Sequence, residues 1–134
     1  MAKPNPVVHF EMPYKDAERV AEFYKTVFGW DMANMGKQMG DYITAATAET
    51  DENRMVKTPG AINGGFYPLE AAPQSKEPSV VISVDDIKKA MEGVKKAGGE
   101  LMGEPMEIPG IGLYVSFKDT EGNRASLLQA NERG

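Results

Sequence analysis

Hydrophobic and polar residues along the chain form short strand-like runs and two segments with helical spacing. Residues 6–13 are partly β-branched and bounded by prolines, which is typical of a strand. Between Asp16 and Gly29, apolar side chains recur at steps of three and four, which predicts a helix that begins after Asp16 and ends at the glycine. Further strands are predicted at 30–32, 42–45 and 61–67, and the polar, partly acidic residues 48–60 predict a loop.

The same order of elements restarts after a predicted linker at residues 69–77. When His9 is placed over Ser79, an offset of 70 residues, Asp16 meets Asp86 and Gly29 meets Gly99. Recurrence at a fixed offset indicates internal duplication. The second copy predicts a helix after Asp86 and a loop at 103–110, with strands at 79–84, 100–102, 113–117 and 124–129.

The duplication predicts an α+β protein of two βαβββ modules, at about residues 6–68 and 78–130, within one domain over residues 1–134. Each half is too small for a large core of its own. We therefore expect the modules to pair, and the pattern leaves open whether they pair within one chain or exchange between two copies.

Composition narrows the possible chemistry. The chain has no cysteine and one histidine, which excludes disulfides, thiolate nucleophiles and multi-histidine metal cages. Its net charge of −5 argues against a nucleic-acid or anionic membrane partner. No apolar run approaches the roughly 20 residues of a membrane span, and residues 1–6 lack an export signal, so we expect a cytoplasmic protein.

Three motifs resemble one known family. The first runs from His9 through Asp16 and Phe23-Tyr24 to Val27-Phe28-Gly29-Trp30; the others are Ile62-Asn63-Gly64-Gly65 and the hairpin from Lys118 to Arg124. Together they resemble the glyoxalase/bleomycin resistance/extradiol dioxygenase proteins, the vicinal oxygen chelate superfamily. The resemblance implies an incomplete eight-stranded mixed β-barrel with its helices outside, a small organic ligand in the cavity between the modules, and a homodimer.

The resemblance also implies four positions for ligands of a divalent metal. They fall on His9, on Asn63 or Gly64, on Ser79 and on Ser126. Only His9 is a strong metal ligand, because serine hydroxyls are neutral and compete poorly with water. We therefore expect no bound divalent metal and no other cofactor.

Strand alternation predicts which side chains share a face. If His9 points inward, Glu11 does too, and Ser79, Arg124 and Ser126 line further strands in the same way. Histidine exchanges protons near neutral pH, and arginine binds carboxylates or enolates. The candidate catalytic residues are therefore His9 and Glu11, and the candidate ligand-binding residues are Asn63, Phe66, Ser79, Tyr114, Arg124 and Ser126.

Structural alternatives stay open for the same residues. Glu11 and Arg124 would serve equally as an internal ion pair, with His9 hydrogen-bonded and inert. The face of the strand that Tyr114 occupies is also open. Tyr24 and Phe28 are predicted to face the core, given their helical spacing.

Two functions remain, together with the possibility of an accessory domain. The first is a metal-independent binding protein for a small organic molecule. The alternative is a lyase or isomerase, similar to glyoxalase I, that moves a proton next to a carbonyl with His9 and Glu11. The sequence leaves open whether the protein is an enzyme.

Overall fold

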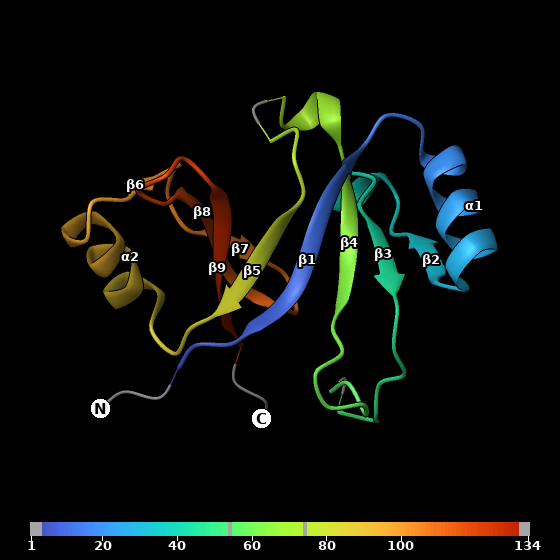
Figure 1. Ribbon diagram of the computed structural model, residues 1–134, viewed down its shortest axis with the longest axis horizontal. Helices are drawn as coiled ribbons and strands as arrows, with labels where there is room; N and C mark the ends of the chain where they lie inside the picture. The colour runs from blue at the N-terminus through green and yellow to red at the C-terminus, as the bar shows by residue number, and fades with distance from the viewer. Residues whose placement is uncertain (1–3, 54, 74, 132–134) are drawn as a thin grey trace. The chain divides into compact units, whose positions relative to one another are not determined.

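The computed structural model describes residues 4–53, 55–73 and 75–131. Internal contacts divide these residues into two compact units. The first unit comprises residues 9–78, and the second unit comprises residues 4–8 together with 79–131. Strand β1 (Val7–Tyr14) runs from the second unit into the first (Figure 1).

The first unit is a four-stranded sheet with one long helix. After β1 come α1 (Ala17–Phe28), β2 (Asp31–Asn34), the 3-10 turn η1 (Lys37–Met39), β3 (Ile43–Ala46), β4 (Asn63–Pro68) and the 3-10 turn η2 (Leu69–Ala71). The strand order is β2-β3-β4-β1. β1 and β4 are parallel, and the other neighbours are antiparallel.

The second unit repeats this topology. It contains β5 (Ser79–Ser83), α2 (Ile87–Lys96), β6 (Glu100–Leu101), β7 (Met106–Ile108), β8 (Gly112–Lys118) and β9 (Arg124–Ala130). Its order is β5-β9-β8-β6, with β5 and β9 parallel and β8 antiparallel to β9 and β6. The predicted α+β class with two βαβββ modules is therefore confirmed.

One part of the prediction was wrong. Residues 103–110 were expected to form a loop, but Met106–Ile108 pair antiparallel with β8 as β7. The described residues thus form nine strands rather than eight. A three-residue strand between two prolines is too short to show an alternating pattern, so backbone pairing with β8 defines it.

The predicted helix boundaries follow from the capping residues. The Asp16 and Asp86 side chains accept hydrogen bonds from the backbone N–H groups of Arg19 and Lys89, at 3.0 and 3.1 Å. Gly29 ends α1 in the left-handed conformation at φ 72°, which glycine adopts without steric cost. The helix starts were therefore predictable from single residues.

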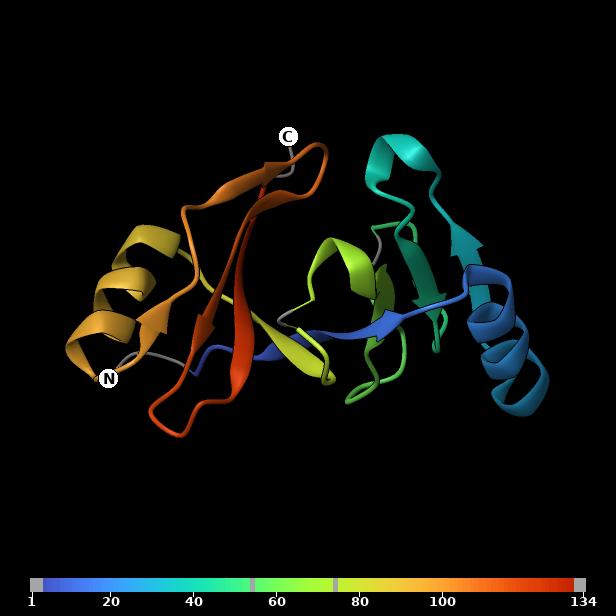
Figure 2. The ribbon, with the colours of Figure 1, turned by 90° about the horizontal axis from the view of Figure 1, so that it is seen from above.

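Each helix packs on the sheet of its own unit. In the first unit, Val20 and Tyr24 of α1 lie against a core that includes Ile43 and Phe66. In the second unit, Ala90 and Val94 of α2 lie against a core that includes Val115 and Leu127. Figure 2 shows α2 beside the strands of its own unit. In the described parts of the chain, no helix is both long and apolar enough to cross a bilayer.

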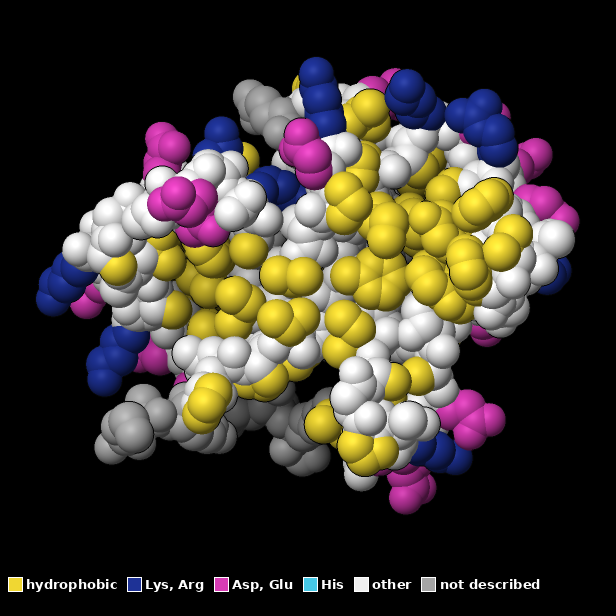
Figure 3. Space-filling view, in the orientation of Figure 1, with side chains coloured by type: hydrophobic (Ala, Val, Ile, Leu, Met, Phe, Trp, Pro, Cys, Tyr) yellow, Lys and Arg dark blue, Asp and Glu magenta, His cyan; other side chains and the backbone are white. Residues whose placement is uncertain are grey.

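The predicted core position of Phe28 was wrong, because 57% of its surface is exposed. Trp30 stacks on Tyr24 with ring centroids 4.7 Å apart and fills the space beside the core, which leaves Phe28 at the solvent-facing end of the helix. Hydrophobic side chains consequently gather on the surface of the first unit, over α1 and the neighbouring strands (Figure 3).

Candidate functional site

The first unit contains a hydrogen-bonded group of three ionisable or polar side chains, which we name the His9 cluster: His9, Tyr42 and Glu11. His9 Nε2 lies 2.9 Å from the Tyr42 hydroxyl. The same hydroxyl donates to Glu11 Oε2 over 3.1 Å. Glu11 is 8% exposed and His9 is partly buried. Tyr42 therefore connects the two residues that sequence reasoning proposed as a catalytic pair.

The local fold positions all three side chains. His9 and Glu11 are two residues apart on β1 and share one face of the strand. Tyr42 immediately precedes β3, after a turn in which Asp41 has a φ of 55° and its carbonyl accepts a 2.7 Å hydrogen bond from the Tyr14 hydroxyl. This turn fixes the backbone from which the Tyr42 ring extends toward β1.

Glycine at position 65 makes room for that ring. Gly65 pairs with Glu11 across the parallel strands β4 and β1. A Cβ atom at Gly65 would overlap the hydroxyl and Cζ of Tyr42. The Tyr42 ring thus crosses over the bare backbone of β4. This close approach explains why a glycine stands in the interior of the strand.

The hydrogen bonds define the resting protonation of His9. Tyr42 has a single hydroxyl proton, which it donates to Glu11, so its oxygen accepts from His9 Nε2–H. In the neutral imidazole, Nδ1 is then the proton acceptor. Burial lowers the pKa of His9 from its usual range, and the negative charge of Glu11 opposes this shift only in part. The neutral form is therefore favoured in the folded protein.

This lowered pKa predicts a dependence of stability on pH. A histidine whose pKa is lower in the folded than in the unfolded state binds protons preferentially after unfolding. The contribution of neutral His9 to the free energy of unfolding is complete above the pKa of histidine in the unfolded chain, about 6.5. It is lost as the pH falls through the lower pKa of His9 in the folded protein. We expect the free energy of unfolding, measured in urea, to decrease from pH 7 toward pH 5. His9→Gln should flatten this part of the profile; an unchanged profile would contradict the assignment to His9.

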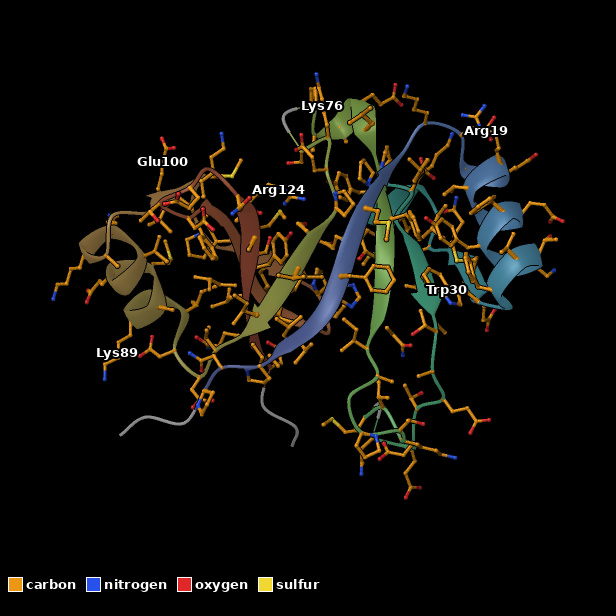
Figure 4. All side chains as sticks on the ribbon, viewed as in Figure 1. Arg19, Trp30, Lys76, Lys89, Glu100 and Arg124 are labelled. Atoms are coloured by element: carbon orange, nitrogen blue, oxygen red, sulfur yellow. The ribbon has the colours of Figure 1, made fainter. Side chains whose placement is uncertain are left out.

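The second unit contains a different group, which we name the Arg124 cluster: Arg124, Ser79, Ser116, Ser126 and Tyr114. Arg124 is at the start of β9 (Figure 4). It donates to Ser79 Oγ over 2.8 Å and to Ser116 Oγ over 3.3 Å. Ser126 is fully buried and donates to the Tyr114 hydroxyl over 2.8 Å. Neighbouring strands β5, β9 and β8 bring these side chains together.

The hydroxyl protons in the Arg124 cluster follow one direction. Because Ser126 donates its only proton to Tyr114, Ser116 is the donor in the 2.9 Å bond between the two serines. Donors therefore run from Arg124 through Ser116 and Ser126 to Tyr114. A partly buried guanidinium surrounded by hydroxyl groups is suited to bind a carboxylate or phosphate, because such a cation attracts anions strongly where water is scarce.

Four of the six predicted ligand-binding residues thus lie in one cluster: Ser79, Tyr114, Arg124 and Ser126. The other two make contacts inside the first unit, and their predicted role in ligand binding stays a prediction. Asn63 Oδ1 accepts from the backbone N–H groups of Thr47 and Ala48, at 2.8 and 2.9 Å. Phe66 is 1% exposed in the core of the first unit. Glu11 and Arg124 belong to different units, and their ion pair stays a prediction.

The side chains at the four positions implied for a metal do not fit a divalent cation. Asn63 already binds the backbone of Thr47 and Ala48, and the Ser79 oxygen accepts from a guanidinium, which repels cations. The Ser126 hydroxyl is committed to Tyr114, and His9 Nε2 to Tyr42. Within the described ranges, no three His, Asp or Glu side chains are placed to hold a metal ion.

Sequence reasoning missed Tyr42 and left Ser116 without a role. Tyr42 was interpreted only as the start of a strand. The useful signal was the pair Gly64-Gly65 within a predicted strand, since glycines there mark the close approach of another group. The structure identifies these groups as the rings of Phe10 and Tyr42.

Comparison with known proteins identifies relatives of similar length. Residues 7–127 match the family described as Glyoxalase/Bleomycin resistance protein/Dioxygenase superfamily. A glyoxylase-like domain-containing protein from Didymella fabae is 31% identical over 121 residues, which cover 87% of this chain and 88% of that protein. A probable lactoylglutathione lyase from Vibrio cholerae is 26% identical, with 92% and 89% covered.

Solved structures agree on the fold. Methylmalonyl-CoA epimerase from Streptomyces coelicolor, in complex with 2-nitronate-propionyl-CoA, has a TM-score of 0.68 at 11% identity and covers 96% of this chain and 99% of its own. The epimerase from Mycobacterium tuberculosis has a TM-score of 0.67 at 15% identity, with 98% and 94% covered. At such identities the likeness establishes the fold alone.

Proposed function

Because the chain belongs to the glyoxalase/bleomycin resistance protein/dioxygenase superfamily, we propose that it binds a small organic acid through Arg124 without a divalent metal. One observation supports this proposal most strongly: the guanidinium is partly buried and held by Ser79 and Ser116. Two anchoring hydroxyls fix its plane, so that little side-chain freedom is lost when an anion binds. Ser126 is fully buried and donates to the Tyr114 hydroxyl, so it positions Tyr114 within the cluster.

Paired probes test this proposal. Phenylpyruvate carries a carboxylate next to a carbonyl, whereas phenylacetone keeps the ring and carbonyl without the carboxylate. We expect calorimetry to detect phenylpyruvate and not phenylacetone. Arg124→Gln should weaken phenylpyruvate binding by about 100-fold, because it removes a charged hydrogen bond from a partly desolvated site. Arg124→Lys should weaken it by about tenfold, since lysine keeps the charge but loses the planar fork.

Thermal denaturation of the same variants separates binding from structure. Lower thermal stability with unchanged affinity for phenylpyruvate would overturn the proposal and assign Arg124 a structural role. Equal binding of phenylpyruvate and phenylacetone would also contradict it, because the carboxylate would then contribute nothing.

The His9 cluster favours a second candidate function, a lyase or isomerase that moves a proton next to a carbonyl. In this reaction His9 Nδ1 takes a proton from the carbon, while the Nε2 proton passes to Tyr42 and the Tyr42 proton passes to Glu11. The carbon keeps the bonding electron pair as an enolate, and Glu11 becomes a neutral acid. Proton exchange between phenylpyruvate and deuterated water, followed by NMR, distinguishes this enzyme from a protein that only binds.

We also propose that the chain forms a homodimer through the exposed face of α1. No described residue of α1 is buried, and Val27 and Phe28 are 56% and 57% exposed. Adjacent apolar side chains at the end of a helix are suited to cover one another across a two-fold axis. Sedimentation velocity over a concentration series tests this proposal, and a monomer at every concentration would refute it.

A further inference from the structure

A groove of about 500 Å³ opens in the first unit, beside the start of α1. The end of β1 supplies Tyr14, the first turns of α1 supply Val20 and Phe23, and η2 supplies Leu69. Tyr14 is 8% exposed and its hydroxyl is bound to the Asp41 carbonyl, so its ring forms a fixed wall. Phe23 is 54% exposed. The groove thus offers apolar surface within the size range of small-molecule sites.

Cations surround this apolar surface. Lys15, Arg19 and Lys76 line the groove, with Asp16 as the acidic residue among the lining side chains. Arg19 and Lys76 are labelled in Figure 4. Basic side chains are thus in excess in this groove, whereas acidic residues are in excess in the chain as a whole, which has 20 acidic and 15 basic residues. Within the described ranges, no carboxylate lies at ion-pair distance from any of the three cations.

The acidic groups nearby reduce the positive charge only in part. Asp16 directs its carboxylate to the backbone N–H of Arg19, where it caps α1. Asp41 and Glu70 both act electrostatically on the Tyr14 hydroxyl, but neither lines the groove. Among the side chains that line the groove, three cations therefore stand beside one carboxylate, and that carboxylate is bound to the backbone of α1, so the lining itself carries an excess of positive charge.

We propose that this groove is a second small-molecule site, for a phosphate monoester attached to a flat apolar body. The phosphate dianion would be held by Arg19, with Lys15 and Lys76 adding positive charge along the groove, and the apolar body would lie against Phe23 and Tyr14. Arginine provides two parallel donors for phosphate oxygens, and the lysines add charge. This site is separate from the Arg124 cluster and does not depend on the function proposed for it.

Binding of 1-naphthyl phosphate tests the proposal. Naphthol lacks the anion and inorganic phosphate lacks the apolar body, so we expect both to bind at least about tenfold more weakly. The double variant Arg19→Gln/Lys76→Gln should weaken naphthyl phosphate binding by at least about tenfold, because both exposed cations are removed. Added salt should weaken binding to the unchanged protein, since it screens exposed charges.

The matched control is Lys95→Gln/Lys96→Gln, which removes two exposed cations from the last turn of α2 in the other unit. It should leave the affinity for 1-naphthyl phosphate unchanged. Absence of binding, or equal affinity in the Arg19/Lys76 variant and its control, would overturn the proposal. Binding that is lost only in Arg124→Gln would also overturn it, because the probe would then occupy the Arg124 cluster.

Discussion

Gly65→Ala is expected to lower the free energy of unfolding by about 2 kcal/mol. The new methyl group would overlap the hydroxyl and Cζ of Tyr42, so the ring must swing away. That movement breaks the hydrogen bonds from Tyr42 to His9 and Glu11 at once. Glu11 is 8% exposed, and loss of a donor to a buried carboxylate is costly. Chemical denaturation measures the change directly.

Gly93→Ala provides the matched control. Gly93 lies inside α2 with a helical backbone, and nothing lies within 4 Å of a Cβ atom placed there. Alanine should therefore raise the free energy of unfolding by about 0.5–1 kcal/mol, through helix propensity. If Gly65→Ala were as well tolerated as Gly93→Ala, the position of the Tyr42 ring over β4 would be incorrect.

Tyr42→Phe is expected to reduce any proton exchange at the carbon of phenylpyruvate by about 100-fold, with the ring retained against Gly65. The variant removes the one hydroxyl that joins His9 to Glu11. The Nε2 proton of His9 then loses the route through the Tyr42 hydroxyl to the carboxylate. NMR of the imidazole nitrogens supplies a measurement that does not depend on turnover: the Nε2–H tautomer should dominate in the unchanged protein and lose that dominance in the variant.

Tyr67→Phe is the control for this experiment. It removes a tyrosine hydroxyl from β4 of the same unit, one that donates to the Ser75 carbonyl rather than to the His9 cluster. It should leave both the tautomer and the exchange rate unchanged. A dominant Nδ1–H tautomer in the unchanged protein would contradict the hydrogen-bond directions on which the relay depends.

The fold could be predicted from the sequence because the residues that begin and end its helices act through local contacts. Asp16, Gly29 and Asp86 define helix boundaries through contacts within a few residues of themselves. Strand β7 was not accessible, because three residues between prolines become a strand only by pairing with β8. Phe28 was misplaced for a related reason: its exposure depends on Trp30 filling the space beside Tyr24.

In the candidate site, too, some features could be predicted from local sequence and others could not. Alternation along single strands correctly grouped Arg124 with Ser126 and His9 with Glu11. Tyr42 could not be placed by that rule, because it approaches from a turn 31 residues beyond Glu11. The direction of the Tyr114 side chain likewise required the hydrogen bond from Ser126. Local periodicity thus predicts which residues share a strand face, and long-range contacts decide which of them interact.

The shared topology of the two units has a consequence for which side chains can be altered independently. Position for position, His9 of one half corresponds to Ser79 of the other, yet one anchors a group that can exchange protons and the other holds a fixed cation. Two copies of one framework thus hold different polar groups at the same position. A substitution in the His9 cluster would change the acid–base group of the first unit without removing any hydrogen bond of the Arg124 cluster.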